Sequence, residues 1–151
     1  MADFRAADQE RFLFKAGKRK LRVVDFSARE EVSSPFEVDL TLATRDDEVE
    51  ATFDDVIGEV GLLTIYGHTT DSVRYIQGIV NKFWQTGSTG RFFLYKATLV
   101  PTLWLLSLEQ DCRIFQDKNV KEVIGEVLTE SGITSDRFDF RLQGTYEKME
   151  Y

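Results

Sequence analysis

Residues 60–100 read VGLLTIYGHTTDSVRYIQGIVNKFWQTGSTGRFFLYKATLV. The stretch contains three apolar segments, Val60 to Tyr66, Val73 to Trp84 and Phe92 to Val100, separated by the turn-rich sequences GHTTDS and TGSTG. Short polar turns between segments of strand length are typical of an antiparallel meander. Such a meander favours a β-barrel or a sandwich over a parallel sheet with crossover helices.

The residues before this stretch continue the pattern. Two apolar segments, Phe12 to Phe14 and Leu21 to Phe26, flank a turn around Gly17. From Phe36 to Leu42, apolar and polar residues alternate strictly, which predicts one buried face and one wet face. We therefore expect a mainly β fold with some α structure (α+β): an antiparallel β-barrel, followed by one amphipathic helix near residues 120–131.

The segment from Val73 to Trp84 has apolar side chains on both faces. One face carries Val73, Tyr75, Ile79 and Phe83, and the other carries Ile76, Val80 and Trp84. An exposed face this apolar needs a cover, which this chain, a continuation of it or a neighbouring subunit could provide. The alternative is that both sets belong to the core of a single chain.

The expected helix has clear end signals. Its aliphatic face consists of Val120, Val123, Ile124, Val127 and Leu128. Asn119 and Glu122 form the pattern of a capping box at its start, and Gly132 is placed to end it. Because Glu122, Glu126 and Glu130 repeat at i,i+4 spacing, the helix is weak by itself. We expect its aliphatic face to pack on the β-portion of the same chain.

One more strand is predicted after the helix. Phe138, Phe140 and Leu142 alternate there with the charged residues Arg137, Asp139 and Arg141. This spacing is typical of a half-buried strand.

Composition limits the classes of function. The chain has 151 residues, of which 42% are hydrophobic, so it can bury the core of one domain. Its formal net charge of −7 argues against a nucleic-acid partner, since such proteins need a cationic face. One local basic run opposes this trend: Lys15, Lys18, Arg19, Lys20 and Arg22. Gly17 lies inside the run, so we interpret it as a solvated hairpin turn with its flanks.

The sequence gives no sign of an exported, disulfide-bonded or membrane-spanning chain. Cys112 is the single cysteine and cannot form an intrachain disulfide. The first ten residues, MADFRAADQE, lack the apolar core of a signal peptide, and no apolar run reaches the roughly 20 residues of a membrane span. We expect synthesis in the cytoplasm, and any export must use a machine that does not read a cleavable signal.

No catalytic or metal-binding constellation is apparent. His68 is the only histidine and lies in a predicted turn, and Cys112 is expected to be a small, semi-buried residue. The acidic residues are grouped in one stretch: Asp46, Asp47, Glu48, Glu50, Asp54 and Asp55. Paired catalytic carboxylates flank a cleft, whereas these residues lie together in one loop-like stretch. We therefore interpret the stretch as a solvated loop followed by a short helical turn. No enzyme activity, cofactor or metal is therefore expected.

The residues around position 100 resemble a known family. The segment from Arg91 to Gln116 reads RFFLYKATLVPTLWLLSLEQDCRIFQ and is similar to the N-terminal region of VgrG proteins, the trimeric spikes of bacterial type VI secretion systems, which are related to contractile phage tail hubs. Further similar segments are Ser34 to Leu42, Ile57 with Gly58, Gln77 to Val80, Asn119 to Gly132 and Tyr146 to Tyr151. Met149 departs from the pattern, because family members more often carry arginine there.

The resemblance implies a fold, a role and partners. Residues 1–110 would form the barrel-like portion of a hub domain, and residues 111–151 the helix and strand that begin its next part. The family continues beyond the position of Tyr151. Three copies would form a collar with approximately sixfold symmetry against a hexameric secretion tube protein, with baseplate components and a spike-tip protein as further partners. The type VI machinery would then secrete the protein.

Four apolar residues are the candidate interface: Trp84, Trp104, Leu105 and Leu106. Three consecutive large apolar residues at 104–106 cannot all face one core in an extended strand. They either contact a partner or form a helical turn inside the domain. The alternative function is a monomeric ligand-binding β-domain that uses the aromatic strand face. The oligomeric state distinguishes this function from that of a trimeric spike.

Overall fold

The computed structural model describes residues 10–45, 48, 50–69 and 72–150. The chain divides into two compact units, residues 1–101 and 102–151. The first unit contains β1 (Phe12–Ala16), β2 (Arg19–Arg29), β3 (Glu37–Arg45), η1 (Phe53–Asp55), β4 (Val60–Tyr66), β5 (Val73–Ser88) and β6 (Phe92–Val100). The second contains η2 (Thr102–Leu108), α1 (Val120–Glu130) and η3 (Ser135–Arg137). Across the described ranges, the helices are all too short or too polar to cross a bilayer.

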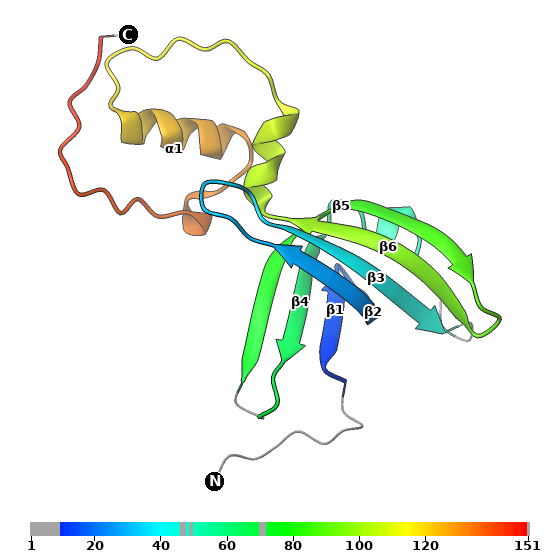
Figure 1. The fold of residues 1–151 in the computed structure, drawn as a ribbon. Helices are drawn as coiled ribbons and strands as arrows, with labels where there is room; N and C mark the ends of the chain where they lie inside the picture. Colours follow the sequence, from blue (N-terminus) through cyan, green and yellow to red (C-terminus); the bar gives the residue numbers. More distant parts are fainter. Residues whose placement is uncertain (1–9, 46–47, 49, 70–71, 151) are drawn as a thin grey trace. The chain divides into compact units, whose positions relative to one another are not determined.

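The six strands form a closed antiparallel barrel in the order β1-β2-β3-β6-β5-β4 (Figure 1). The predicted meander is β4, β5 and β6, with β5 four residues longer than expected. Pairing of β1 with β4 closes the barrel, with Phe14 opposite Leu63. The expectation of a mainly β fold with an antiparallel barrel and one amphipathic helix is confirmed.

Strand β3 shows how alternation builds the barrel core. Val38, Leu40 and Leu42 are at most 2% exposed, whereas Glu37 and Asp39 face water. The core cluster also takes residues from every other strand, among them Phe14, Leu21, Leu63, Ile76, Val80, Phe83, Tyr95 and Leu99. Tyr95 stacks on Phe83, and its hydroxyl accepts a hydrogen bond of 3.3 Å from the Ala51 N–H. Tyr95 thereby attaches the segment after β3 to the barrel interior.

A β-bulge explains the apolar residues on both faces of β5. The register with β6 shifts between Val80 and Lys82, so the inward face changes from even to odd positions. Val80 is therefore buried before the bulge and Phe83 after it, while Trp84 points outward and is 47% exposed. Most of the apolar set thus belongs to the core, and Trp84 and Tyr75 are its exposed members.

A row of small residues crosses three neighbouring strands where the barrel is tightly packed. Ala16, Gly61 and Gly78 are aligned by the registers of β1, β4 and β5. A Cβ atom on Gly61 would lie 2.6 Å from Leu99 Cδ1, and one on Gly78 would lie 2.1 Å from the Val100 carbonyl oxygen. Because these neighbouring atoms lie so close to the backbone, neither position has room for a side chain.

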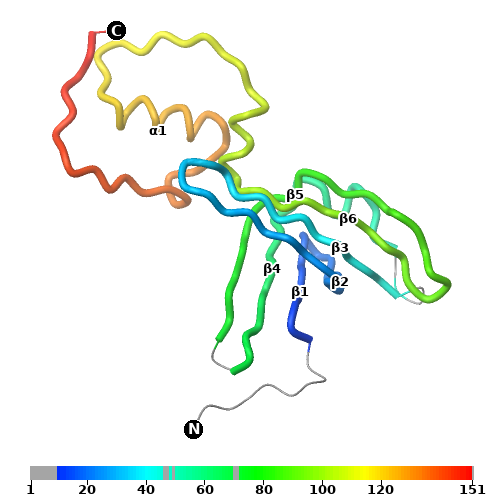
Figure 2. Tube along the Cα trace, viewed as in Figure 1, coloured from blue at the N-terminus to red at the C-terminus, as the bar shows by residue number. Residues whose placement is uncertain are grey.

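The second unit contains the predicted helix with its predicted ends. Asn119 Oδ1 accepts from the Glu122 N–H at 2.9 Å, and Glu122 Oε2 accepts from the Asn119 N–H at 2.8 Å, which completes the capping box. Gly132 has a φ of +80°, the left-handed conformation that ends many helices. Figure 2 shows α1 between the segment that precedes it and the segment that follows it.

Two expectations for this unit are wrong. The alternating residues Phe138 to Leu142 form no strand; within the described part of this unit, the pairing found is a single bridge between Lys118 and Met149. Phe138 and Phe140 instead contact each other edge to face, and Phe140 approaches Gly125 of α1. Alternation predicts a strand only where a neighbouring strand is available to share hydrogen bonds.

The aliphatic face of α1 is also not buried as expected. No residue of α1 is fully buried: Val123, Val127 and Leu128 are half-buried, and Ile124 is 44% exposed. The packing of this face on the β-portion stays a prediction. The helix also has a capping box and ion pairs with the flanking segments. The domain boundary expected near residue 110 stays a prediction.

Candidate functional site

Trp84 lies on the outer surface of the barrel, next to a hollow of about 410 Å³. The hollow is lined by Asp25, Ser27, Asp39, Leu40, Thr41, Trp84, Lys96 and Ala97. Trp84 is opposite Lys96 in the register of β5 and β6, and Thr98 Oγ1 donates a 2.9 Å hydrogen bond to Asp39 Oδ1. An exposed indole beside fixed charges is a surface suited to contact with another protein.

The other three candidate residues form part of the 3-10 helix η2. Trp104, Leu105 and Leu106 are half-buried, and the Ser107 hydroxyl donates a 2.7 Å hydrogen bond to the Trp104 carbonyl oxygen. Their neighbours Leu103 and Leu108 are 50% and 63% exposed. The helical turn was one of the two expected outcomes, but none of the three side chains is fully buried. Their role in an interface stays a prediction.

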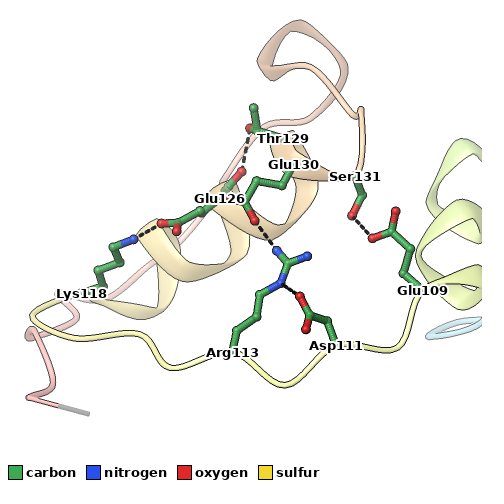
Figure 3. Close-up of polar contacts among 9 residues, drawn as sticks. Glu109, Asp111, Arg113, Lys118, Glu126, Thr129, Glu130 and Ser131 are labelled. Atoms are coloured by element: carbon green, nitrogen blue, oxygen red, sulfur yellow. Dashed lines mark hydrogen bonds and ion pairs between the residues drawn. The ribbon is translucent and has the colours of Figure 1, made fainter.

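The glutamates of α1 are each paired with a cation from outside the helix. Arg113 binds both Asp111, at 2.7 Å from Nε to Oδ2, and Glu130, while Lys118 binds Glu126 (Figure 3). Lys148 lies 3.9 Å from Glu122. The sequence analysis predicted repulsion among these glutamates and missed their partners, of which Arg113 and Lys118 precede the helix and Lys148 follows it.

Arg113 is the centre of this ion-pair network. The hydrogen bond from Arg113 lowers the pKa of the Asp111 carboxyl. The same bond, followed by the negative charge of Glu130, raises the pKa of the guanidinium. Ser131 also donates a 3.0 Å hydrogen bond to Glu109, so the segment before α1 is held along the helix as Figure 3 shows.

The residues considered for catalysis do not converge in the described part of the chain. His68 is exposed in its turn, and Cys112 is exposed rather than semi-buried, which corrects that expectation. Cys112 lies in an irregular segment, between Asp111 and Arg113, which form an ion pair with each other. Among the residues that the structure describes, no three His, Cys, Asp or Glu side chains gather as metal ligands would.

The acidic stretch has a structural role where it is described. Asp46 and Asp47 lie outside the described residues, whereas the predicted helical turn is present as η1. Asp55 accepts from the Thr52 hydroxyl at 2.8 Å and from Arg19 Nη2 at 2.6 Å. The hydrogen bonds from Thr52 and then Arg19 lower the pKa of Asp55 to about 2. Asp55 is therefore a charged cap that ties η1 to β2.

The comparisons with known proteins agree on one family. Residues 29–151 match the family described as phage tail baseplate hub (GPD). The type VI secretion system spike proteins VgrG1b and VgrG5 of Pseudomonas aeruginosa are each 33% identical over 135 residues, which is 89% of this chain. That segment is 18% of VgrG1b and 16% of VgrG5, so the chain spans less than a fifth of these relatives.

A solved structure shares the fold. It belongs to an E. coli component of the type VI secretion system that exhibits structural similarity to the T4 bacteriophage tail proteins gp27 and gp5. The likeness covers 91% of this chain and 37% of that one, with a TM-score of 0.71 and 22% sequence identity. The fold is thus shared with a solved structure, and the chain belongs to the phage tail baseplate hub family.

Proposed function

We propose that this chain forms the first part of the trimeric hub of a type VI secretion spike, and that it acts by shape and rigidity. The observation that carries the proposal is the hub-family match over residues 29–151, together with spike relatives that align over 89% of the chain. Membership in a hub family supports a structural, non-enzymatic role. The closed barrel suits this role, because its six strands form one continuous hydrogen-bonded ring.

In the proposed assembly, three copies form a collar against the hexameric secretion tube protein, with baseplate components around it. A spike-tip protein would bind a later part of the natural protein. Trp84, Trp104, Leu105 and Leu106 are the proposed contacts between subunits. Their partial exposure supports this role, since large apolar side chains gain most from being covered. The protein would assemble in the cytoplasm and leave through the secretion machinery without a cleavable signal peptide.

The test is the oligomeric state of the natural protein that contains this chain, measured by light scattering across a dilution series. A trimer is expected. Trp84→Ala should weaken trimer formation by about tenfold, as truncation of a central aromatic does in many interfaces. Val32→Ala is the matched control, because Val32 is 96% exposed and lies outside the proposed contacts.

A monomer at all concentrations would contradict the proposal. It would favour the alternative, a monomeric ligand-binding β-domain, for which one observation speaks: the hollow of about 410 Å³ beside Trp84. If Trp84→Ala and Val32→Ala weakened trimer formation equally, Trp84 would have no specific role in the interface.

A further inference from the structure

The hairpin of β1 and β2 gathers cations on the outer face of the barrel. Lys15 is directly opposite Lys20 in the register of the two strands. Lys15 lies between Phe14 and Ala16, which are both 0% exposed, so its own side chain points outward. Arg22, two residues after Lys20, faces the same side. This cationic face stands out on a chain whose net charge is −7.

The arrangement costs stability. Like charges directly opposite each other on neighbouring strands repel, because their Cβ atoms are about 5 Å apart. Glu10 gives limited relief, at 4.0 Å from Lys20 and 3.7 Å from Arg22. No described residue forms an ion pair with Lys15. An acidic residue at position 15 would replace this repulsion by an attraction.

The two rows that carry the cations continue across the sheet onto β4 and β5. The first row across the sheet runs from Lys20 and Lys15 to Leu62 and Gln77. The next row runs from Arg22 and Leu13 to Thr64 and Tyr75. Tyr75 is 64% exposed, although Thr64 beside it is only 5% exposed. Leu13 and Thr64 separate Tyr75 from Arg22, so a segment that crosses β1 and β4 would reach both. Tyrosine and arginine are both enriched at protein interfaces.

We propose that this face, defined by Lys15, Lys20, Arg22 and Tyr75, docks an acidic segment of a partner protein. Carboxylates of the segment would neutralise Lys15 and Lys20, and an apolar side chain would cover the Tyr75 ring. A protein segment fits better than a membrane or a nucleic acid, because a chain of net charge −7 is repelled by an extended polyanion. A short segment meets only the local cations. The proposal rests on the barrel surface and is independent of the spike assignment.

Lys15→Glu is the decisive variant, since it separates stability from binding. It places opposite charges across from each other in β1 and β2, so the melting temperature should stay equal or rise. Binding should fall by about tenfold. The probe is a fluorescent peptide of repeated Glu-Leu-Glu triplets, titrated by anisotropy, with the Gln-Leu-Gln peptide as the uncharged reference. Raising NaCl from about 50 to about 500 mM should also weaken binding, because salt screens exposed charges.

Lys82→Glu is the matched control, because it changes the net charge equally on an exposed residue of β5, opposite Thr98. It should change the affinity by less than about twofold. Three results would overturn the proposal: unchanged affinity in Lys15→Glu, equal loss in Lys82→Glu, or preference for anionic lipid vesicles over the peptide. The last result would indicate a membrane surface as the ligand.

Discussion

Three glycine-to-alanine substitutions should rank in the order in which the barrel leaves room for a methyl group. In Gly87→Ala the new Cβ meets nothing within 4 Å. In Gly61→Ala it lies 2.6 Å from Leu99 Cδ1 and 3.2 Å from atoms of Phe14 and Val80. In Gly78→Ala it lies 2.1 Å from the Val100 carbonyl oxygen, a backbone atom that no rotamer change can move.

The magnitudes follow from these contacts. Gly87→Ala should be neutral or stabilise by about 0.4–1 kcal/mol, because alanine restricts the unfolded chain. In Gly61→Ala a methyl group of Leu99 must retreat by about 1 Å to restore ordinary contact. Overpacking of this kind costs about 1–3 kcal/mol, from which the same unfolded-chain gain is subtracted. Gly78→Ala must displace β6 itself, and we expect a loss of at least about 3 kcal/mol.

The assay is urea unfolding followed by circular dichroism, with the slope of free energy against urea compared among variants. An unchanged slope shows that each substitution acts on stability rather than on compactness. If Gly61→Ala were as stable as Gly87→Ala, the tight approach of Leu99 to β4 would be refuted. Circular dichroism reports the β-barrel directly and avoids the tryptophan signal, which Trp84 and Trp104 contribute from different units.

Three further predictions use the same apparatus. Tyr95→Phe leaves the buried Ala51 N–H without its acceptor and should cost about 1–3 kcal/mol in urea unfolding; a loss near zero would mean that the 3.3 Å bond contributes nothing. Ile124→Ala should cost less than about 1 kcal/mol, because the side chain is 44% exposed, and a loss of about 2–5 kcal/mol would show that it is buried after all. The folded pKa of Asp55 lies below its ordinary value of 3.8, so the carboxylate stabilises the fold above that pH and loses this effect as the pH falls toward 2. Asp55→Asn should therefore flatten the melting temperature against pH in that window, and an unchanged profile would contradict the hydrogen bonds from Thr52 and Arg19.

Local patterns in the sequence predicted a strand or a helix end well where the pattern itself causes that structure to form. The strict alternation from Phe36 to Leu42 corresponds to buried and exposed sides of β3. The limits of β4 and β6 agree with the apolar segments 60–66 and 92–100. The capping box of Asn119 and Glu122 is local by nature, since the bonds join residues three apart.

The errors arose where a pattern needs a distant partner. Alternation at Phe138 to Leu142 predicted a strand, yet no neighbouring strand pairs with it in the described part of its unit. The aliphatic face of α1 predicted burial, yet Ile124 remains 44% exposed. Periodicity shows which residues share a face, but it cannot show whether anything covers that face.

For this protein, the sequence by itself determined the class of fold, the family resemblance and the absence of a recognisable catalytic motif, because all three reside in the order and type of neighbouring residues. Only the tertiary structure decided which strands meet, where β5 changes its inward face, and which side chains remain on the surface. The pairing of β1 with β4 and the opposition of Lys15 and Lys20 depend on register. Register is set by packing of the whole barrel, which no local segment specifies.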